Sequence, residues 1–508
     1  MRTTKTTKLL ALILSLLMLF TMIPFSASAE SEPKTILDVA QNDGNGNYYL
    51  TGDVTVTATA TDLFTGTFDG KGYTVTTTVP LFNKVNGATI KNLTVTGTVT
   101  GYAAVASCVT SENLVSKFEN ITNKATVTNE TATITDGGFG VTSGVVSAGG
   151  IVCLVYNTKA EFIGCVNEGD ITANRLPAGI VSYVYTGEVT VENCKNSGTI
   201  TGTGDNAAGI VAFIYSGSTV EVSDSENSGA VCGNRYIGGI VGGLNTSTAD
   251  SDVSITACSN SGAITATTTR AGGIVGYLKN MDSGYDVSYC YNTASVTASG
   301  GKQECGGIVG CLADTLSKVT GCYNSGTVTG TQAAQIYWNT STDDRGLNYY
   351  LSDGSDSVLA PYYSSGSGYT GTAKSYSENE LESGKLAYTM NTDIGQEIYF
   401  QNINTSDELR DYHPVLDSTH EHVSDVNGED TPDTPNDTPD TPNDTPISGS
   451  DTNNITTDKK DTDTTKPEET TDEVKGGCGS VVGGSALMIA GAVSLVGAVI
   501  TSKKKKDN

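Results

Sequence analysis

The sequence predicts an all-β protein that folds as a right-handed parallel β-helix, a solenoid with three strands in each coil. The first observation is a Gly-Ile-Val tripeptide that begins at residues 150, 179, 209, 239, 273 and 307, at steps of 29, 30, 30, 34 and 34 residues. The second is an asparagine placed four residues before an aliphatic residue in seven successive repeats. The third is composition: short β-branched runs alternate with Gly and Asn and show no helical period. A near-constant period of about 30 residues is typical of a solenoid.

The repeated asparagines are predicted to form one column along the solenoid. Successive coils of a β-solenoid lie about 4.8 Å apart, so that one repeat position becomes a row of identical side chains. Each side-chain amide can then donate a hydrogen bond to the carbonyl oxygen of the next asparagine. The column consists of Asn123, Asn167, Asn196, Asn227, Asn260, Asn292 and Asn324.

A column of thiols is predicted beside the asparagines. We expect these cysteines to be mostly reduced, because side chains stacked in one column point in parallel directions that suit a disulfide poorly. Cys305 and Cys311 flank one strand and are better candidates for a disulfide. The predicted thiol column consists of Cys165, Cys194, Cys258, Cys290 and Cys322, with Ser225 in the place of one cysteine.

Both ends of the chain predict export and display. Basic residues, an apolar run and Ala27-Ser28-Ala29 form a signal peptide with its cleavage site. A Thr/Pro/Asp-rich segment predicts a disordered stalk. The uncharged run 481–500 is long enough for one transmembrane helix, and the lysines after it place the C-terminus in the cytosol. We therefore expect a single-pass membrane protein with an extracellular ectodomain.

Seven segments follow from these signals. We expect an insertion in one coil around residues 129–143, where two asparagines of the column are 44 residues apart. A capping box at Ser377 predicts a helix over Leu381 to Asn391, in a segment that would cover the open end of the solenoid. The boundaries are 1–29 for the signal peptide, 30–122 for the N-terminal cap and first coils, 123–345 for the repeat solenoid, 346–423 for a short C-terminal α/β cap, 424–477 for the stalk, 478–502 for the anchor and 503–508 for the basic tail.

Residues 50–345 resemble known surface proteins. The stretch 63–75, LFTGTFDGKGYTV, is similar to the opening coils of bacterial surface proteins with a pectin-lyase-like β-helix. The Gly-Ile-Val repeats resemble the GLUG-type repeats of Gram-positive cell-surface proteins, with Ile in every copy where the motif has Leu. GLUG repeats also accompany immunoglobulin-cleaving zinc peptidases, but the HExxH motif of those enzymes is missing and His420-Glu421-His422 has the wrong spacing. The resemblance implies a Gram-positive cell-surface location.

The Gly-Ile-Val strand predicts an aromatic surface. Alternation places Ile180, Ser182 and Val184 in the core and turns the residues between them outward. The outward stripe would be a ligand platform, because a row of exposed rings usually marks an interaction site. Three alternatives stay open: the insertion or the post-solenoid segment covers the stripe, a second molecule covers it, or the strand register is inverted. The predicted stripe consists of Tyr156, Tyr183, Tyr185, Phe213, Tyr215 and Tyr277.

A basic column is predicted at the corner before the same strand. These side chains would either contact a ligand or serve as solubilising charges that cap carbonyl groups. The column consists of Arg175, Arg235, Arg270 and Lys302.

The sequence favours a binding protein over an enzyme. The net charge of −27 argues against nucleic-acid binding. No catalytic triad, metal-ligand cluster or cofactor motif is present in the sequence, so we expect no catalytic residue, metal or cofactor. The predicted function is an adhesin that binds a glycan or a host protein; its oligomeric state stays open. The alternatives are a β-helix lyase or glycosidase that uses clustered carboxylates, and a purely structural surface spacer.

Overall fold

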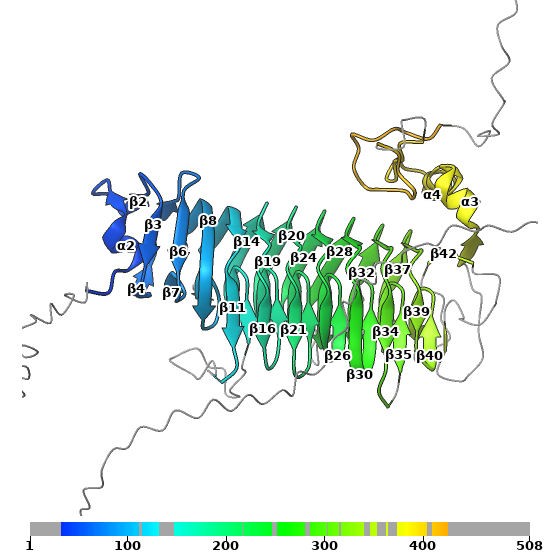
Figure 1. Ribbon diagram of the computed structural model, residues 1–508. Helices are drawn as coiled ribbons and strands as arrows, with labels where there is room; N and C mark the ends of the chain where they lie inside the picture. Colours follow the sequence, from blue (N-terminus) through cyan, green and yellow to red (C-terminus); the bar gives the residue numbers. More distant parts are fainter. Residues whose placement is uncertain are drawn as a thin grey trace, which may run out of the picture. The chain divides into compact units, whose positions relative to one another are not determined.

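The computed structural model describes residues 32–424 except 111–113, 132–146, 216, 246–250, 280–284, 302, 314–315, 340–345, 353–361, 364–372 and 404–408. Within these residues the chain forms an all-β, right-handed parallel β-solenoid, which confirms the predicted fold class (Figure 1). The coils have three faces, and each face is a ladder of strands paired in parallel with the equivalent strands of the neighbouring coils.

One coil shows the pattern of the others. Strand β18 (Val181–Tyr185) lies on the first face, β19 (Glu188–Glu192) and β20 (Lys195–Asn196) on the second, and β21 (Ile200–Gly202) and β22 (Ala207–Ala208) on the third. The predicted three strands per coil are therefore three faces, two of which are divided into a pair of short strands.

The remaining strands repeat this order along the chain. The first face consists of β4 (Ala60–Phe64), β7 (Phe82–Val85), β9 (Ala106–Thr110), β13 (Val152–Tyr156), β18, β23 (Val211–Tyr215), β27 (Val241–Asn245), β31 (Val275–Lys279), β36 (Val309–Leu312), β41 (Tyr337–Asn339) and β43 (Tyr362–Tyr363). The second face contains β5 (Thr67–Asp69), the start of β8 (Thr89–Thr100), β10 (Val115–Asn123), β14 (Lys159–Ile163), β15 (Val166–Asn167), β19, β20, β24 (Thr219–Ser223), β25 (Glu226–Asn227), β28 (Asp252–Thr256), β29 (Ser259–Asn260), β32 (Asp286–Ser288), β33 (Tyr291–Asn292), β37 (Lys318–Thr320), β38 (Tyr323–Asn324), β42 (Tyr349–Leu351) and β44 (Lys374–Tyr376). The third face contains β11 (Thr126–Asn129), β12 (Ala148–Gly149), β16 (Ile171–Ala173), β17 (Pro177–Ala178), β21, β22, β26 (Val231–Gly238), β30 (Ile264–Gly272), β34 (Val296–Ala298), β35 (Glu304–Gly306), β39 (Val328–Thr329) and β40 (Gln332–Ala334).

The first coil begins with short elements that precede the regular ladder. Helix α2 (Ile36–Val39) buries Ile36 completely in the main core. The antiparallel hairpin of β1 (Gln41–Asn42) and β2 (Asn47–Tyr49) leads into the parallel ladder, to which β3 (Val54–Val56) and β6 (Thr74–Thr77) belong. No helix among the described residues is long and apolar enough to cross a membrane. The predicted signal peptide, anchor and basic tail lie outside the described residues, as does the stalk from residue 425 onward.

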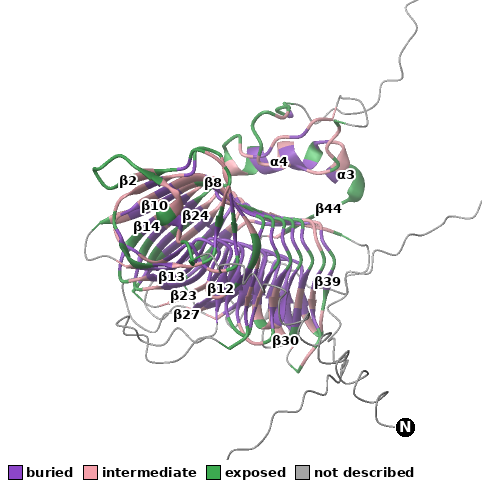
Figure 2. Ribbon diagram, turned by 60° about the vertical axis from the view of Figure 1, so that its left-hand side comes forward, coloured by how far each residue is buried: buried purple, intermediate pink, exposed green. Residues whose placement is uncertain are grey.

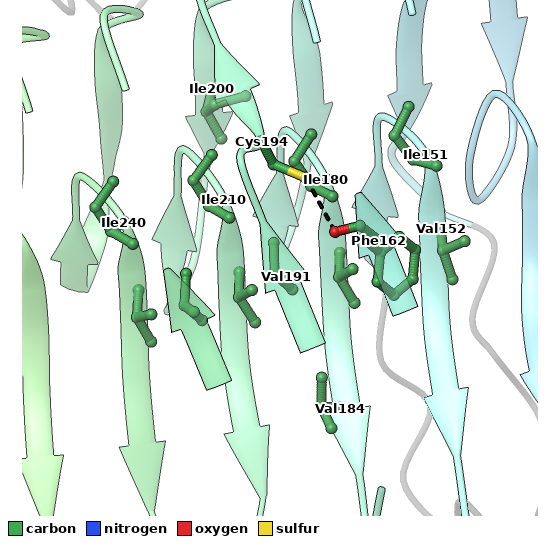
Figure 3. Close-up of a cluster of buried hydrophobic side chains, with 14 of the residues drawn as sticks. Ile151, Val152, Phe162, Ile180, Val184, Val191, Cys194, Ile200, Ile210 and Ile240 are labelled. Carbon is green, nitrogen blue, oxygen red and sulfur yellow. Dashed lines mark hydrogen bonds between the residues drawn. The ribbon is translucent and has the colours of Figure 1, made fainter. Parts of the chain in front are cut away.

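Much of the backbone of the coils is formed by buried residues (Figure 2). Their side chains, mostly aliphatic, fill the interior of the coils. The isoleucines of the Gly-Ile-Val repeats form a column in which Ile151, Ile180, Ile210 and Ile240 are fully buried (Figure 3). Burial of apolar side chains stabilises the folded state by about 25 cal/mol per Å² of apolar surface, so the column is a principal source of stability.

The seven asparagines form one uninterrupted ladder. Each Nδ2 donates to the Oδ1 of the next asparagine at 2.7–2.8 Å. Each also donates to the backbone carbonyl two residues further on, at 2.8–3.1 Å. The last member, Asn324, donates to Gln335 Oε1 at 2.8 Å, which ends the ladder. All seven side chains are at most 1% exposed, so their amides are satisfied entirely within the protein.

The ladder explains the glycine of the Gly-Ile-Val tripeptide. A Cβ atom at Gly179 would lie 2.5 Å from the Oδ1 of Asn196 and 2.3 Å from the backbone oxygen of Gly209. The equivalent glycines in the other coils meet the same two obstacles. The two halves of the repeat are therefore coupled, because the asparagine ladder occupies the space that any side chain at the glycine would need.

The alternation predicted for the Gly-Ile-Val strand is wrong at Ser182. Val181 and Val184 are both fully buried in the main core, and the ladder pairs skip the position after Val181. The hydroxyl of Ser182 instead donates to the backbone oxygen of Leu176 at 2.5 Å. Because one residue leaves the pleat, the inward set is Ile180, Val181 and Val184.

The prediction that the cysteines are mostly reduced is confirmed for most of the described cysteines. Nine of the described cysteines are free and buried. Cys194 donates to the backbone oxygen of Phe162 in the preceding coil at 3.4 Å (Figure 3). Cys305 and Cys311 are both free, so the pairing suggested between them is wrong.

The predicted insertion falls at one corner of the third face. The pairs Asn129↔Ala173 and Ala148↔Pro177 keep the coil in register on both sides, so the surplus residues lie between Asn129 and Ala148. Residues 132–146 of this segment are outside the described residues.

The segment after the solenoid contains two helices where one was predicted. The capping box of Ser377 and Glu380 is present, and α3 (Glu378–Glu382) begins directly after it. Gly384, with a φ of 81°, separates α3 from α4 (Lys385–Ile394) (Figure 1). This left-handed conformation suits glycine and ends the first helix early.

Candidate ligand-binding site

The predicted stripe contains a stacked column of tyrosines on the first face. Tyr156 and Tyr185 have ring centroids 5.3 Å apart with planes 15° apart, and Tyr185 and Tyr215 have centroids 4.8 Å apart with planes 8° apart. All three side chains are partly buried. Because Tyr185 is stacked between two rings, only its ring edge and its hydroxyl group can meet a ligand.

A second row of the stripe is buried, contrary to the prediction of an exposed platform. Tyr183 is 7% exposed and packs with Leu154 and Leu176. Burial raises the pKa of the Tyr183 hydroxyl above its usual value. Tyr277 is 8% exposed and belongs to a different cluster. The prediction fails here because side chains of the neighbouring corner pack over these rings.

The stripe is interrupted at Gly243. The register pairs Phe213 with Gly243 and Gly243 with Tyr277, so one coil lacks a ring. A Cβ at Gly243 would lie 2.5 Å from Asn206 Oδ1 and 3.5 Å from the Cβ of Tyr236. Tyr236 enters from the corner and stacks on Tyr277, with ring centroids 4.7 Å apart. The predicted single stripe is therefore two separate aromatic clusters.

The basic residues predicted to share a corner do not form one column. The strand register places Arg235 opposite Thr269, so Arg270 lies one position beyond the column that contains Arg235. Arg235 pairs with Asp205 at 2.6 Å, and Arg175 is exposed. Lys302 lies outside the described residues.

Arg270 is held inside the second aromatic cluster. Its Nε donates to the buried carboxylate of Glu304 at 2.6 Å, and its Nη1 donates to the Tyr236 hydroxyl at 3.2 Å. The guanidinium carbon lies 4.4 Å from the centroid of the Tyr277 ring. A buried arginine is stabilised when its donors and its charge are matched in this way. Arg270 therefore stabilises the packing of Tyr236 and Tyr277 at this corner.

A groove that the sequence interpretation missed lies on the outside of the second face, beneath the C-terminal segment. Its volume is about 550 Å³. The floor is formed by adjacent columns from several coils and the roof by residues after α4. The floor consists of Asn193, Lys195, Asp224, Glu226, Asn227, Ser228, Ala257, Ser259, Ser261, Tyr291 and Thr293, and the roof of His413, Val415, Leu416, Asp417 and His420.

Two tyrosine hydroxyl groups join the segment after the helices to the last coils. The hydroxyl of Tyr323, on the outside of the last coils, donates to the backbone oxygen of Pro414. The hydroxyl of Tyr399, in the segment itself, donates to the backbone oxygen of Gly321 at 2.7 Å. Within the segment, Val415 pairs with Phe400 in an antiparallel bridge.

The groove combines an aromatic corner with charged and hydroxyl groups. Tyr291 stacks on Tyr323 in the next coil, with centroids 5.0 Å apart, and its ring centroid lies 5.6 Å from that of His413. Burial raises the pKa of the Tyr291 hydroxyl to about 12, so it stays a hydrogen-bond donor. Lys195 and Glu226 form an ion pair at 3.1 Å on the floor.

The roof contributes a histidine with a fixed orientation. His420 Nδ1 lies 2.5 Å from the carboxylate of Asp411, and Nε2 lies 3.8 Å from the carboxylate of Asp417, which also lines the groove.

The sequence contained one signal for this groove. The residue between the thiol column and the asparagine ladder changes from coil to coil, as Lys195, Glu226, Ser259 and Tyr291, although its neighbours repeat. Such variation indicates an outward position, but the roof comes from residues more than 100 positions later.

No group of His, Cys, Asp or Glu side chains in the described part of the chain could hold a metal ion. No family model matches the sequence, and no curated protein matches it. The GLUG resemblance therefore stays a prediction. Among solved structures, the chain is similar to a putative immunoglobulin A1 protease from Bacteroides ovatus, with 11% identity and a TM-score of 0.22, over 68% of this chain and 85% of that chain. We draw nothing about function from this likeness.

Proposed function

We propose that the chain is a cell-surface binding protein of the adhesin type, whose solenoid holds a ligand in the roofed groove. The observation that carries this proposal is the groove, which combines a volume of about 550 Å³ with an aromatic corner and several hydrogen-bonding side chains. Concave sites of this size with a few polar groups are the usual places for ligands on proteins.

The groove is a better candidate than the tyrosine column of the first face. Tyr156, Tyr185 and Tyr215 stack on one another, so both faces of the central ring, Tyr185, are already occupied. In the groove, the coil before Tyr291 carries the small side chain of Ser259 in place of another ring. A ligand in the groove can therefore reach more of Tyr291 than it can reach of a ring inside the column.

Display outside the cell follows from the sequence signals. The signal peptide would direct export, and the segment 478–502 would anchor the chain in the membrane of a Gram-positive cell. The acidic stalk would hold the solenoid away from the surface, because its like charges repel. In this proposal the C-terminal segment is the roof of the groove.

A glycan-cleaving enzyme is the second candidate. The groove is lined by the carboxylates of Asp224, Glu226 and Asp417, and pairs of carboxylates perform glycoside hydrolysis. Incubation of the chain with polysaccharides, followed by measurement of new reducing ends, distinguishes the two candidates. Sustained release of reducing ends that is lost in Glu226→Gln would favour the enzyme over the binding protein.

The binding proposal is tested by adhesion of cells that display the full chain to surfaces coated with mucin or with polysaccharides. We expect Tyr291→Ala to reduce adhesion and Tyr185→Ala to leave it unchanged, at equal display levels. Tyr185 is the matched control, because it is also a partly buried tyrosine in a stacked column. The reverse result would place the binding site on the first face.

A further inference from the structure

We propose that the ligand of the groove is a neutral carbohydrate chain that lies along the solenoid axis. This inference rests on the proposed function and names the chemical class of its ligand.

The floor repeats polar groups at the spacing of the coils. Ser228, Ser261 and Thr293 each follow an asparagine of the ladder by one residue, so they occupy one column. All three line the groove. Their hydroxyl groups therefore recur about every 4.8 Å along the axis. A chain of sugars also presents hydroxyl groups at regular intervals, so several units can bind in the same way.

The aromatic corner suits the apolar side of a sugar ring. Tyr291 and His413 meet at an angle of 53° between their planes, so they form two walls of the groove. A sugar has C–H groups on its ring faces and hydroxyl groups around its edge. The C–H groups of one sugar unit can pack on the aromatic rings, while the hydroxyl groups of further units along the chain reach Glu226 and Lys195, two and three coils away.

The backbone of the floor is not available for an extended peptide. Peptides that bind to sheets usually add a strand and need unpaired backbone groups. Here the N–H groups of Glu226, Ser259 and Tyr291 donate to carbonyl groups of the preceding coil at 2.9–3.0 Å. A ligand must therefore be recognised through side chains, which favours a carbohydrate over a peptide.

The charge of the lining disfavours acidic ligands. Asp224, Glu226 and Asp417 line the groove, and the side chain of Lys195 is already paired with Glu226. The whole chain also carries a net charge of −27. Glycans with carboxylate, sulfate or phosphate groups would be repelled, so a neutral chain is the expected ligand.

The test is a calorimetric titration of the full chain with three hexasaccharides: β-1,4-linked glucose, β-1,4-linked N-acetylglucosamine and the acidic α-1,4-linked galacturonic acid. We expect saturable binding of at least one neutral hexamer and binding of the acidic hexamer that is weaker by about tenfold or more. Ser261→Trp fills the groove from an exposed position, so the variant should fold normally and lose the binding. Asn174→Trp, at an exposed position outside the groove lining, is the control.

Each of the other possible results would overturn a specific part of the proposal. Equal binding of the acidic hexamer would refute the charge argument and with it the neutral ligand. If no hexamer binds while Ser261→Trp still reduces adhesion of displaying cells, the groove functions but its ligand is not a carbohydrate of this class. If a neutral hexamer binds equally well to Ser261→Trp, the groove is not the site, and both the inference and the proposed function fall.

Discussion

Replacement of one central member of the asparagine ladder tests how the solenoid is held together. Asn260 donates to Asn292 Oδ1 at 2.7 Å and to the backbone oxygen of Gly262 at 2.9 Å, and it accepts from Asn227 Nδ2 at 2.7 Å. Asn260→Leu keeps a side chain of similar size but removes all three hydrogen bonds. The variant therefore isolates the contribution of the ladder from that of packing.

The expected loss follows from the groups left behind. Asn292 Oδ1 and the backbone oxygen of Gly262 both lose the donor from Asn260, and Asn227 Nδ2 keeps only its bond to the backbone oxygen of Gly229. A buried polar group that loses its partner costs about 1–3 kcal/mol. The two acceptors that lose their donor predict a decrease of about 2–6 kcal/mol in the free energy of unfolding, while the Asn227 amide stays half satisfied. In a solenoid this loss falls on the two interfaces next to the substituted coil.

The assay is urea unfolding followed by circular dichroism, with Asn174→Leu as the control. Asn174 is exposed, and its side chain makes a single exposed hydrogen bond to Thr203, so its replacement should change the free energy by no more than about 0.5 kcal/mol. If Asn260→Leu and Asn174→Leu unfold at the same urea concentration as the wild-type protein, the ladder contributes nothing and the reasoning is refuted.

Three further predictions follow from the same structure. Gly239→Ala should destabilise the protein by about 3 kcal/mol or prevent folding, because a Cβ would lie 2.1 Å from the backbone oxygen of Gly273, whereas Gly52→Ala, with no atom within 4 Å, should be neutral in the same urea titration. Tyr323→Phe removes the hydrogen bond to Pro414, so limited proteolysis should cut the roof segment 409–424 faster while the solenoid melts unchanged; equal cleavage rates would argue against this anchor. Burial raises the pKa of Cys153 and Cys305 from 9.0 to about 12. The same thiols ionise at lower pH in the unfolded chain, so the free energy of unfolding should fall as the pH rises from about 9 towards 12. Replacement of both cysteines by alanine should make this fall smaller.

The parts of the fold that could be predicted from the sequence are those that every coil repeats. The position of Asn260 relative to its aliphatic partner recurs in each repeat, and equal offsets in a solenoid bring residues into one column. The register of the ladder therefore followed from spacing alone. The glycine of the tripeptide also recurs, but its reason, the ladder beside it, needed the structure.

The parts that could not be predicted depend on single residues or on distant segments. Ser182 leaves the pleat without changing the repeat pattern, so simple alternation placed Ser182 instead of Val181 in the core. Gly243 divides the aromatic stripe because a corner residue, Tyr236, enters the space it leaves. The groove requires a roof from residues such as His413, whose position no period of the sequence indicates.

The most direct test of the proposed function compares adhesion of cells that display the wild-type chain with that of cells that display Ser261→Trp. Ser261 is exposed and lines the groove, so the substitution blocks the site without removing a buried contact. The proposal predicts that the variant is displayed at the same level, unfolds at the same urea concentration and loses adhesion. Equal adhesion of the two displayed proteins would contradict the assignment of the groove as the binding site.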